Sequence, residues 1–201
     1  AVLYIVLGWL LLASVAGLGH SFDLTVMLPS TSAVLLVHLA FTRDHAPRTA
    51  GPELTLPLAL AVAITLGYLE DLHQGTPVGA LSLAHGLAYL LAVWAGTRIA
   101  VEGAIVRALA AGVVAAIVDL ITFAELMLLA DRLGIASGAL VRALPMLRWH
   151  ALATVLAAPA VWLLADLVLG LWDRLLGRNR PAPSFLGAGA DGILPHENDV
   201  V

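Results

Sequence analysis

The segment Gly67-Tyr68-Leu69-Glu70-Asp71-Leu72-His73-Gln74-Gly75-Thr76-Pro77-Val78-Gly79 places two neighbouring carboxylates and a Gly/Pro turn between two long apolar runs. A bilayer core offers no water to carboxylates or to unpaired backbone groups. Acids in such a place therefore persist only where packing or function holds them. The segment predicts a membrane hairpin with a polar turn between its two helices.

The composition of the chain indicates a membrane protein. Hydrophobic residues make up 61% of the 201 residues, charged residues only 12%, and the mean hydropathy is +0.97. Apolar runs of roughly 17 to 24 residues recur, and each is long enough to cross about 30 Å of hydrocarbon. The runs are apolar at odd and even positions alike, unlike the alternating strands of a membrane β-barrel. The predicted class is therefore an all-α polytopic membrane protein.

Six transmembrane helices are predicted, packed in one bundle over residues 1–172. Their expected bounds are 2–19, 24–41, 54–72, 77–97, 104–130 and 149–171. The first run has a second interpretation as a cleaved secretory signal, because Ser14-Val15-Ala16 has the small-x-small pattern of a cleavage site.

Residues 173–201 differ in composition from the rest of the chain. They combine Pro, Gly and charged residues, and are predicted to form a disordered cytoplasmic tail. This tail is either a binding segment for a cytosolic partner or a plain solvated terminus.

Arginine predicts the orientation, since all ten basic residues are Arg. Seven are expected on one side of the membrane: Arg43, Arg48, Arg98, Arg107, Arg174, Arg178 and Arg180. The positive-inside rule then places both termini in the cytoplasm and the Glu70/Asp71 turn on the outer side. The other three, Arg132, Arg142 and Arg148, fall in or beside the connection 131–148. That connection is expected to be either a short helix lying in the interface or a loop packed on the spans.

The residue order of the turn predicts a short, stiff connection. Gly75 is expected to end one helix in a left-handed cap, Thr76 to cap the next helix, and Pro77 to occupy its first turn. Gly67 and Gly79 are small enough to let the two helices approach closely. Asp71 lies at the negative end of its own helix and so needs donors, expected from the backbone N–H groups of the Gly75–Val78 turn. Its role is either this structural one or contact with a partner or ligand.

The motif Gly67-x-x-x-Asp71, followed by Gly75-x-Pro77-x-Gly79 and an apolar helix with Leu81 and Tyr89, resembles the signature segment of the rod shape-determining protein MreD family. The specific match covers about 25 residues of the chain, and only the architecture is similar elsewhere. Glu70 beside Asp71 and a long C-terminal tail depart from the family pattern. The family is also similar in organisation to the substrate-binding subunits of energy-coupling-factor transporters.

The resemblance implies a component of the bacterial cell-wall elongation machinery in the cytoplasmic (inner) membrane. Such a protein binds the bitopic protein MreC and works beside the cell-wall synthase complex. No nucleic-acid partner or cofactor is implied, and a homo-oligomer is a further expectation.

A second polar feature lies in the fifth predicted span. Ala108, Gly112, Ala115, Asp119 and Thr122 share one helical stripe, and Glu125 lies about 9 Å beyond Asp119 at 1.5 Å rise per residue. The stripe predicts a close helix contact, and Gly112, Ala115, Asp119, Thr122 and Glu125 are candidates for a partner interface. For Asp119 a structural hydrogen bond, a partner contact and a proton or ligand site are all open. His38, His85, His150 and Asp166 are its candidate partners.

The sequence offers little for enzyme chemistry. Cysteine is absent, which excludes disulfides, thiolate metal sites and Cys nucleophiles. No zinc-protease, nucleophile-elbow or phosphate-loop motif occurs. Ser82 and His85 lie three residues apart, but a His hydrogen-bonded within its bundle is the stronger interpretation. Two function classes follow, namely a non-enzymatic membrane scaffold and a membrane-embedded transport subunit whose acids line a substrate pocket.

Overall fold

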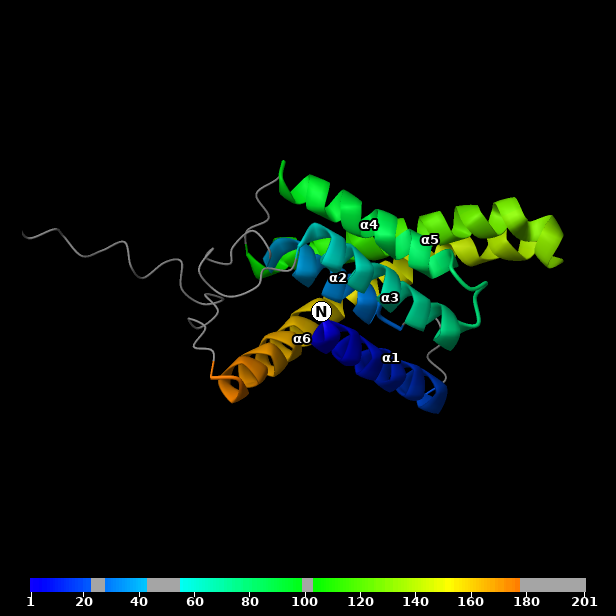
Figure 1. Cartoon of the computed structure of the whole chain (residues 1–201). Helices are drawn as coiled ribbons and strands as arrows, with labels where there is room; N and C mark the ends of the chain where they lie inside the picture. The colour runs from blue at the N-terminus through cyan, green and yellow to red at the C-terminus, as the bar shows by residue number, and fades with distance from the viewer. Residues whose placement is uncertain (23–27, 43–54, 99–102, 178–201) are drawn as a thin grey trace, which may run out of the picture. The chain divides into compact units, whose positions relative to one another are not determined.

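The computed structural model describes residues 1–22, 28–42, 55–98 and 103–177. Their helices are α1 (Val2–Phe22), α2 (Thr31–Thr42), α3 (Leu56–Gln74), α4 (Ala80–Gly96), α5 (Ala104–Leu133) and α6 (Ser137–Leu175), as Figure 1 shows. The described ranges contain no strand, so the predicted all-α class is confirmed. The predicted disordered tail lies, from residue 178 onward, outside the described residues.

The chain divides into two compact units. Residues 1–165 form the first unit, and the residues from Asp166 onward form the second. The boundary falls inside α6, which continues through it as one helix. The packing described below belongs to the first unit, and the single bundle over 1–172 stays a prediction.

Within the described ranges, four helices are long and apolar enough to cross a membrane. They are α1, α3, α5 and α6, with spanning stretches Val2–Gly19, Leu56–Gln74, Ala104–Leu133 and Gly138–Leu175. The second and fourth predicted spans are shorter than expected among the described residues. α4 has 17 residues and α2 only 12, which correspond to about 25 Å and 18 Å of helix. The described residues therefore do not contain the six full-length spans that were predicted.

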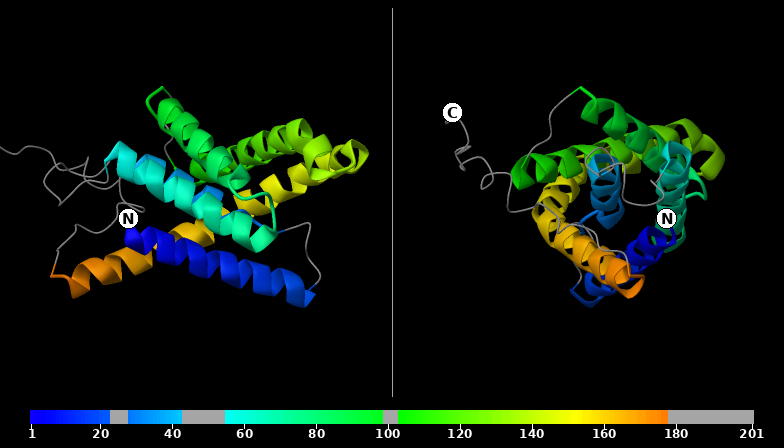
Figure 2. Two further views of the ribbon diagram at one scale, coloured as in Figure 1. Left: turned by 45° about the vertical axis from the view of Figure 1, so that its right-hand side comes forward. Right: turned by 60° about the vertical axis from the view of Figure 1, so that its left-hand side comes forward.

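The short helix α2 is a core element. Every side chain from Thr31 to Phe41 is buried, and the helix packs against α1, α3, α4 and α5. In the right-hand view of Figure 2, α2 lies in the middle of the other helices. Ser30 caps its start, because the Ser30 hydroxyl accepts a hydrogen bond from the Ala33 N–H at 3.2 Å. Hydropathy cannot distinguish a helix buried by protein from one covered by lipid, which is why the sequence predicted a span here.

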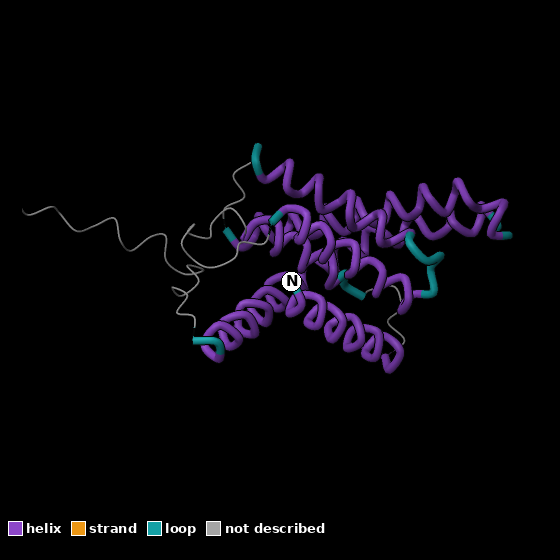
Figure 3. The backbone as a smooth tube through the Cα atoms, in the orientation of Figure 1, coloured by secondary structure: helices purple, strands orange, loops and turns teal. Residues whose placement is uncertain are grey.

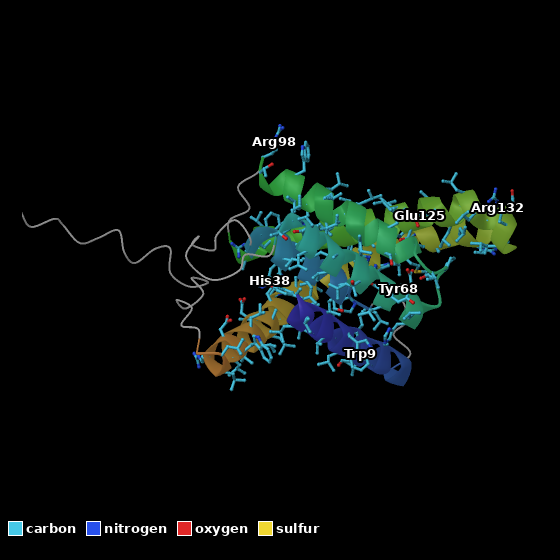
Figure 4. The ribbon with its side chains drawn as sticks, in the orientation of Figure 1. Trp9, His38, Tyr68, Arg98, Glu125 and Arg132 are labelled. Carbon is cyan, nitrogen blue, oxygen red and sulfur yellow. The ribbon has the colours of Figure 1, made fainter. Side chains whose placement is uncertain are left out.

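α6 begins earlier than predicted. It starts at Ser137 and runs for 39 residues, so most of the expected connection 131–148 is the first part of this helix. The loop interpretation is therefore wrong. The segment is also not the separate short helix that was expected, because it is the start of α6, and its interfacial placement stays a prediction. Figure 3 shows the short turns that join α3 to α4 and α5 to α6. Figure 4 shows Arg98 just after the end of α4 and Arg132 in the last turn of α5.

The predicted tight hairpin joins α3 to α4. Gly75 ends α3 in the left-handed conformation (φ 69°), and its N–H donates to the Asp71 carbonyl oxygen at 3.0 Å. The start of α4 differs from the expectation, because Gly79 (φ 102°) directly precedes its first residue, Ala80. Thr76 and Pro77 therefore belong to the turn, and neither caps nor opens α4.

Candidate functional site

Polar side chains from four helices converge at the beginning of α2. We call Ser30, Ser32, Glu70, His85 and Thr154 the core polar cluster. Glu70 comes from the last turns of α3, His85 from α4 and Thr154 from α6, and all five residues are buried. The backbone N–H of Ser30 donates to the Thr154 hydroxyl at 2.9 Å, which ties the start of α2 to α6. The cluster thus lies in the core, close to the α3–α4 turn.

Glu70 is the centre of this cluster. Its Oε2 accepts a hydrogen bond from the Ser32 hydroxyl and lies 3.2 Å from Nε2 of His85. Its Oε1 accepts a hydrogen bond from Nε2 of Gln74 at 2.7 Å. The Glu70 side chain is 4% exposed and the His85 side chain 0%. A carboxylate so far from water is tolerable only with such partners, because an unpaired buried charge costs several kcal/mol.

The contacts of His85 place one ring proton and leave a second one shared. Nδ1 lies 2.8 Å from the Leu81 carbonyl oxygen, which can only accept, so Nδ1 carries a proton. Nε2 lies 3.0 Å from Ser32 Oγ and 3.2 Å from Oε2 of Glu70, and two proton arrangements fit these contacts. In one of them His85 is an imidazolium opposite a carboxylate. Transfer of one proton through Ser32 Oγ to Glu70 would leave both groups neutral with the same contacts, so the cluster carries no net charge in either arrangement.

Ser32, His85 and Glu70 are the residue types of a hydrolytic triad, but their geometry differs from one. In such a triad the acid holds Nδ1 of the histidine, and Nε2 activates the serine. Here the Leu81 carbonyl holds Nδ1, while Glu70 contacts both Nε2 and the serine hydroxyl. Ser32 is also fully buried in the core. The arrangement can share a proton and fix three helices, and it does not present a nucleophile.

Asp71 performs a different task beside the cluster. Its Oδ1 accepts hydrogen bonds from the Thr76 hydroxyl at 2.6 Å and from the Leu81 N–H at 3.0 Å. Its Oδ2 accepts from the N–H groups of Gly79 at 2.9 Å and Ser82 at 3.4 Å. The predicted donors were those of the Gly75–Val78 turn, whereas the observed backbone donors belong to Gly79 and the first turn of α4. Asp71 therefore neutralises the positive end of the neighbouring helix.

Gly67 allows α3 to approach the start of α4. A Cβ atom at Gly67 would lie 2.4 Å from the Leu81 carbonyl oxygen and 2.8 Å from the Cα atom of Ser82. Both are backbone atoms of α4, so a larger residue can be accommodated only by moving the whole helix. The predicted close approach at Gly67 is present in the structure. At Gly79 the structure gives a different reason for glycine, namely its positive φ.

We expect Gly67→Val to open the hairpin and to lower the free energy of unfolding by roughly 2–4 kcal/mol, because an overpacked buried contact adds to the loss of the Asp71 hydrogen bonds. Thermal unfolding of the purified protein in mild detergent measures the effect. Gly170→Val is the matched control, because a Cβ there meets nothing within 4 Å. Equal melting temperatures for the two variants would contradict the close packing of α3 on α4.

The small-residue stripe of α5 faces α6 of the same chain. A Cβ at Gly112 would lie 2.3 Å from Cγ2 of Val155 and 3.2 Å from the Ala151 carbonyl oxygen. Ala115 and Thr122 are buried as well. The predicted close helix contact exists, but it is intramolecular, and Gly112 and Ala115 leave no surface for a partner helix. A bulky residue at Gly112 would disturb the fold itself.

Asp119 forms its hydrogen bond within the chain. Nδ1 of His150 lies 2.7 Å from Oδ2 of Asp119, and the two side chains are 26% and 17% exposed. Of the three roles that the sequence left open, the structure shows the structural hydrogen bond. Beyond Asp119, the Oε1 atom of Glu125 and the hydroxyl of Thr122 are buried and have no hydrogen-bond partner within the described ranges. Figure 4 places Glu125 in the later half of α5.

One cavity of about 450 Å³ lies beside α6. Its walls are apolar, and they are formed by Pro29, Trp149, Leu152, Ala153, Leu156 and Ala157. In the part of the chain that the structure describes, no group of three His, Cys, Asp or Glu side chains could hold a metal ion.

Comparisons of the chain with protein-family models, with curated proteins and with solved structures give no match.

Sequence reasoning missed the most connected residues of the site. Glu70 was treated only as an unexpected second acid, Ser32 was not singled out, and His150 was one of four candidates for Asp119. A local signal existed for part of this arrangement. Ser30-Thr31-Ser32 after Pro29 is typical of a helix start, and Glu70 and Gln74 have the spacing of an intrahelical pair. Pairing between helices carries no such signal.

Proposed function

We propose that the chain is a non-enzymatic scaffold of the bacterial cell-wall elongation machinery, involved in cell shape and resident in the cytoplasmic membrane. The proposal rests on the resemblance of the Gly67–Gly79 segment to the MreD family. MreC is then the partner, the cell-wall synthase complex is adjacent, and both termini face the cytoplasm. The observation that carries the choice of a scaffold over a transporter is the state of the intramembrane acids.

Three of these acids are engaged by the chain itself. Glu70 and Asp71 have both carboxylate oxygens hydrogen-bonded, and Asp119 is bound to His150. The cavity beside α6 is lined by apolar residues. A protein that binds polar substrates directs its polar groups into its pocket. Here they hold the helices together, which supports a rigid body that presents apolar surfaces to other membrane helices.

A transport subunit of the energy-coupling-factor type is the second candidate, and one observation favours it. The hydroxyls of Thr31 and Thr122 and the Oε1 atom of Glu125 are buried without a hydrogen-bond partner in the described residues. Buried polar atoms of this kind are uncommon and would suit a small polar substrate. They come from two helices, α2 and α5.

Co-purification tests the scaffold. The tagged full chain is expressed with MreC of the same organism, extracted in mild detergent and purified. We expect MreC to be recovered in near-stoichiometric amount, because helix packing in a membrane depends on specific contacts. A bitopic protein with an unrelated transmembrane helix is the control and should stay behind. Loss of MreC together with saturable binding of a small polar molecule would replace the scaffold by the transport subunit.

A further inference from the structure

The apolar cavity beside α6 is a groove that follows one face of the helix. Five of its lining residues, at positions 149, 152, 153, 156 and 157, are three or four residues apart and so share that face. Ala153 and Ala157 are half-buried, whereas Leu152 and Leu156 are exposed at its sides. Its volume of about 450 Å³ falls within the roughly 300–1,000 Å³ usual for ligand sites.

Positive charge lies at one end of this groove. The guanidinium carbon of Arg148 is 5.5 Å from the ring centroid of Trp149, which lines the groove. Arg142 precedes Trp149 by two helical turns on the same face, about 10 Å along the axis. Neither arginine forms an ion pair with a carboxylate in the described part of the chain. Asp119, on the neighbouring α5, is occupied by His150.

The order of charged, aromatic and apolar residues along α6 matches the order of headgroup and acyl chain in a phospholipid. Exposed arginines come first, then Trp149, and then the apolar walls from Leu152 to Ala157. Tryptophan is typical of the membrane interface, and the planar fork of arginine pairs with phosphate oxygens by two hydrogen bonds. A lipid in the groove would therefore have its phosphate at the arginines and its chain against the alanines.

We propose that this groove binds one anionic glycerophospholipid, with its phosphate at Arg148 and Arg142 and an acyl chain between Pro29 and the Ala153/Ala157 face. The two positive charges select a lipid with net negative charge over a zwitterionic one. The half-buried alanines leave the space that the chain fills. The site lies in the leaflet on the side of the α3–α4 turn, because Thr154, one turn after His150, contacts Ser30 at the start of α2.

Native mass spectrometry of the full chain tests this site. The protein is purified from mixed micelles of phosphatidylglycerol and phosphatidylcholine, and the lipid retained per chain is measured. We expect one phosphatidylglycerol to be retained in preference to phosphatidylcholine. Arg148→Gln should lower this preference about tenfold, because it removes a charge-assisted contact with the phosphate. Ala153→Leu should reduce retention of both lipids, because its side chain fills the groove.

Arg98→Gln is the matched control. The guanidinium carbon of Arg98 is also 5.5 Å from a tryptophan ring, that of Trp94, but Trp94 does not line the groove. The control should bind lipid like the unmodified protein. Equal losses for Arg98→Gln and Arg148→Gln would overturn the proposal in favour of general attraction of anionic lipid. Unchanged retention in Ala153→Leu, or in Ala157→Leu if the first variant melts early, would also overturn it. The proposal would also be overturned if the purified protein carried a partner's helix in the groove in place of lipid.

Discussion

Replacing either partner of the buried pair Glu70–His85 is expected to cause the largest loss of stability in the described part of the protein. His85→Leu leaves the buried Glu70 carboxyl group without its histidine partner, and Glu70→Leu leaves His85 and Ser32 without the carboxyl oxygen that they contact. Breaking one side of a buried ion pair costs about 3–5 kcal/mol. Each single variant should therefore lower the free energy of unfolding by an amount in that range, measured by denaturant unfolding in mild detergent.

The double variant Glu70→Leu/His85→Leu separates the charge from the packing. An apolar pair of suitable volume removes both charges together, so its cost should be well below the sum of the single costs. His73→Leu is the matched control, because Nδ1 of His73 also contacts a carbonyl four residues earlier but the side chain is exposed. Its effect should stay within about 0.5 kcal/mol. Additive losses in the double variant would show that Glu70 and His85 act independently.

The second large effect is expected at Asp71. Asp71→Ala removes the acceptor for the N–H groups of Gly79, Leu81 and Ser82 and for the Thr76 hydroxyl. Loss of a helix cap and of buried acceptors together should lower the free energy of unfolding by roughly 2–4 kcal/mol. Asp71→Asn should be milder, because its amide keeps one acceptor oxygen. Some loss should remain, because the NH₂ group of the amide faces other donors.

Hydrogen exchange locates the effect of the Asp71 variants. Amide exchange in Asp71→Ala should rise first at residues 79–82, since their N–H groups lose their acceptor. Asp131→Ala, in the exposed end of α5, is the control and should leave this region protected. Faster exchange spread evenly over all helices, with no excess at the start of α4, would contradict a local capping role.

The two acids of the turn thus have separate tasks. Asp71 holds α4 against α3 through backbone donors, whereas Glu70 holds α2 and α4 through side chains. Both tasks stabilise a hairpin packed around a short central helix. A firm core of this kind suits the proposed scaffold, which presents exposed apolar residues such as Ile105 and Leu128, 77% and 84% exposed, on its outer faces. The identity of the partner that covers such faces stays a proposal.

Local features were predictable from the sequence alone. Composition predicted a membrane protein, and apolar residues at odd and even positions alike predicted helices over the strands of a barrel. The Gly75 cap, the antiparallel α3–α4 pair and the need of Asp71 for donors followed from residues within one short segment. The bounds of α5 were predicted within three residues at its end, since caps and hydropathy agree there.

Tertiary structure decided which polar residues meet. The pairs Glu70–His85, Ser32–His85 and Asp119–His150 join positions 15 to 53 residues apart on different helices, so helical periodicity within one segment cannot reveal them. Burial by protein and burial by lipid demand the same apolar side chains, so hydropathy predicted α2 as a span. Small residues allow a close contact with any helix, so the stripe of Gly112 was predicted as a partner surface. Packing placed α2 in the core and the stripe against α6, because the chain's own helices fill those contacts.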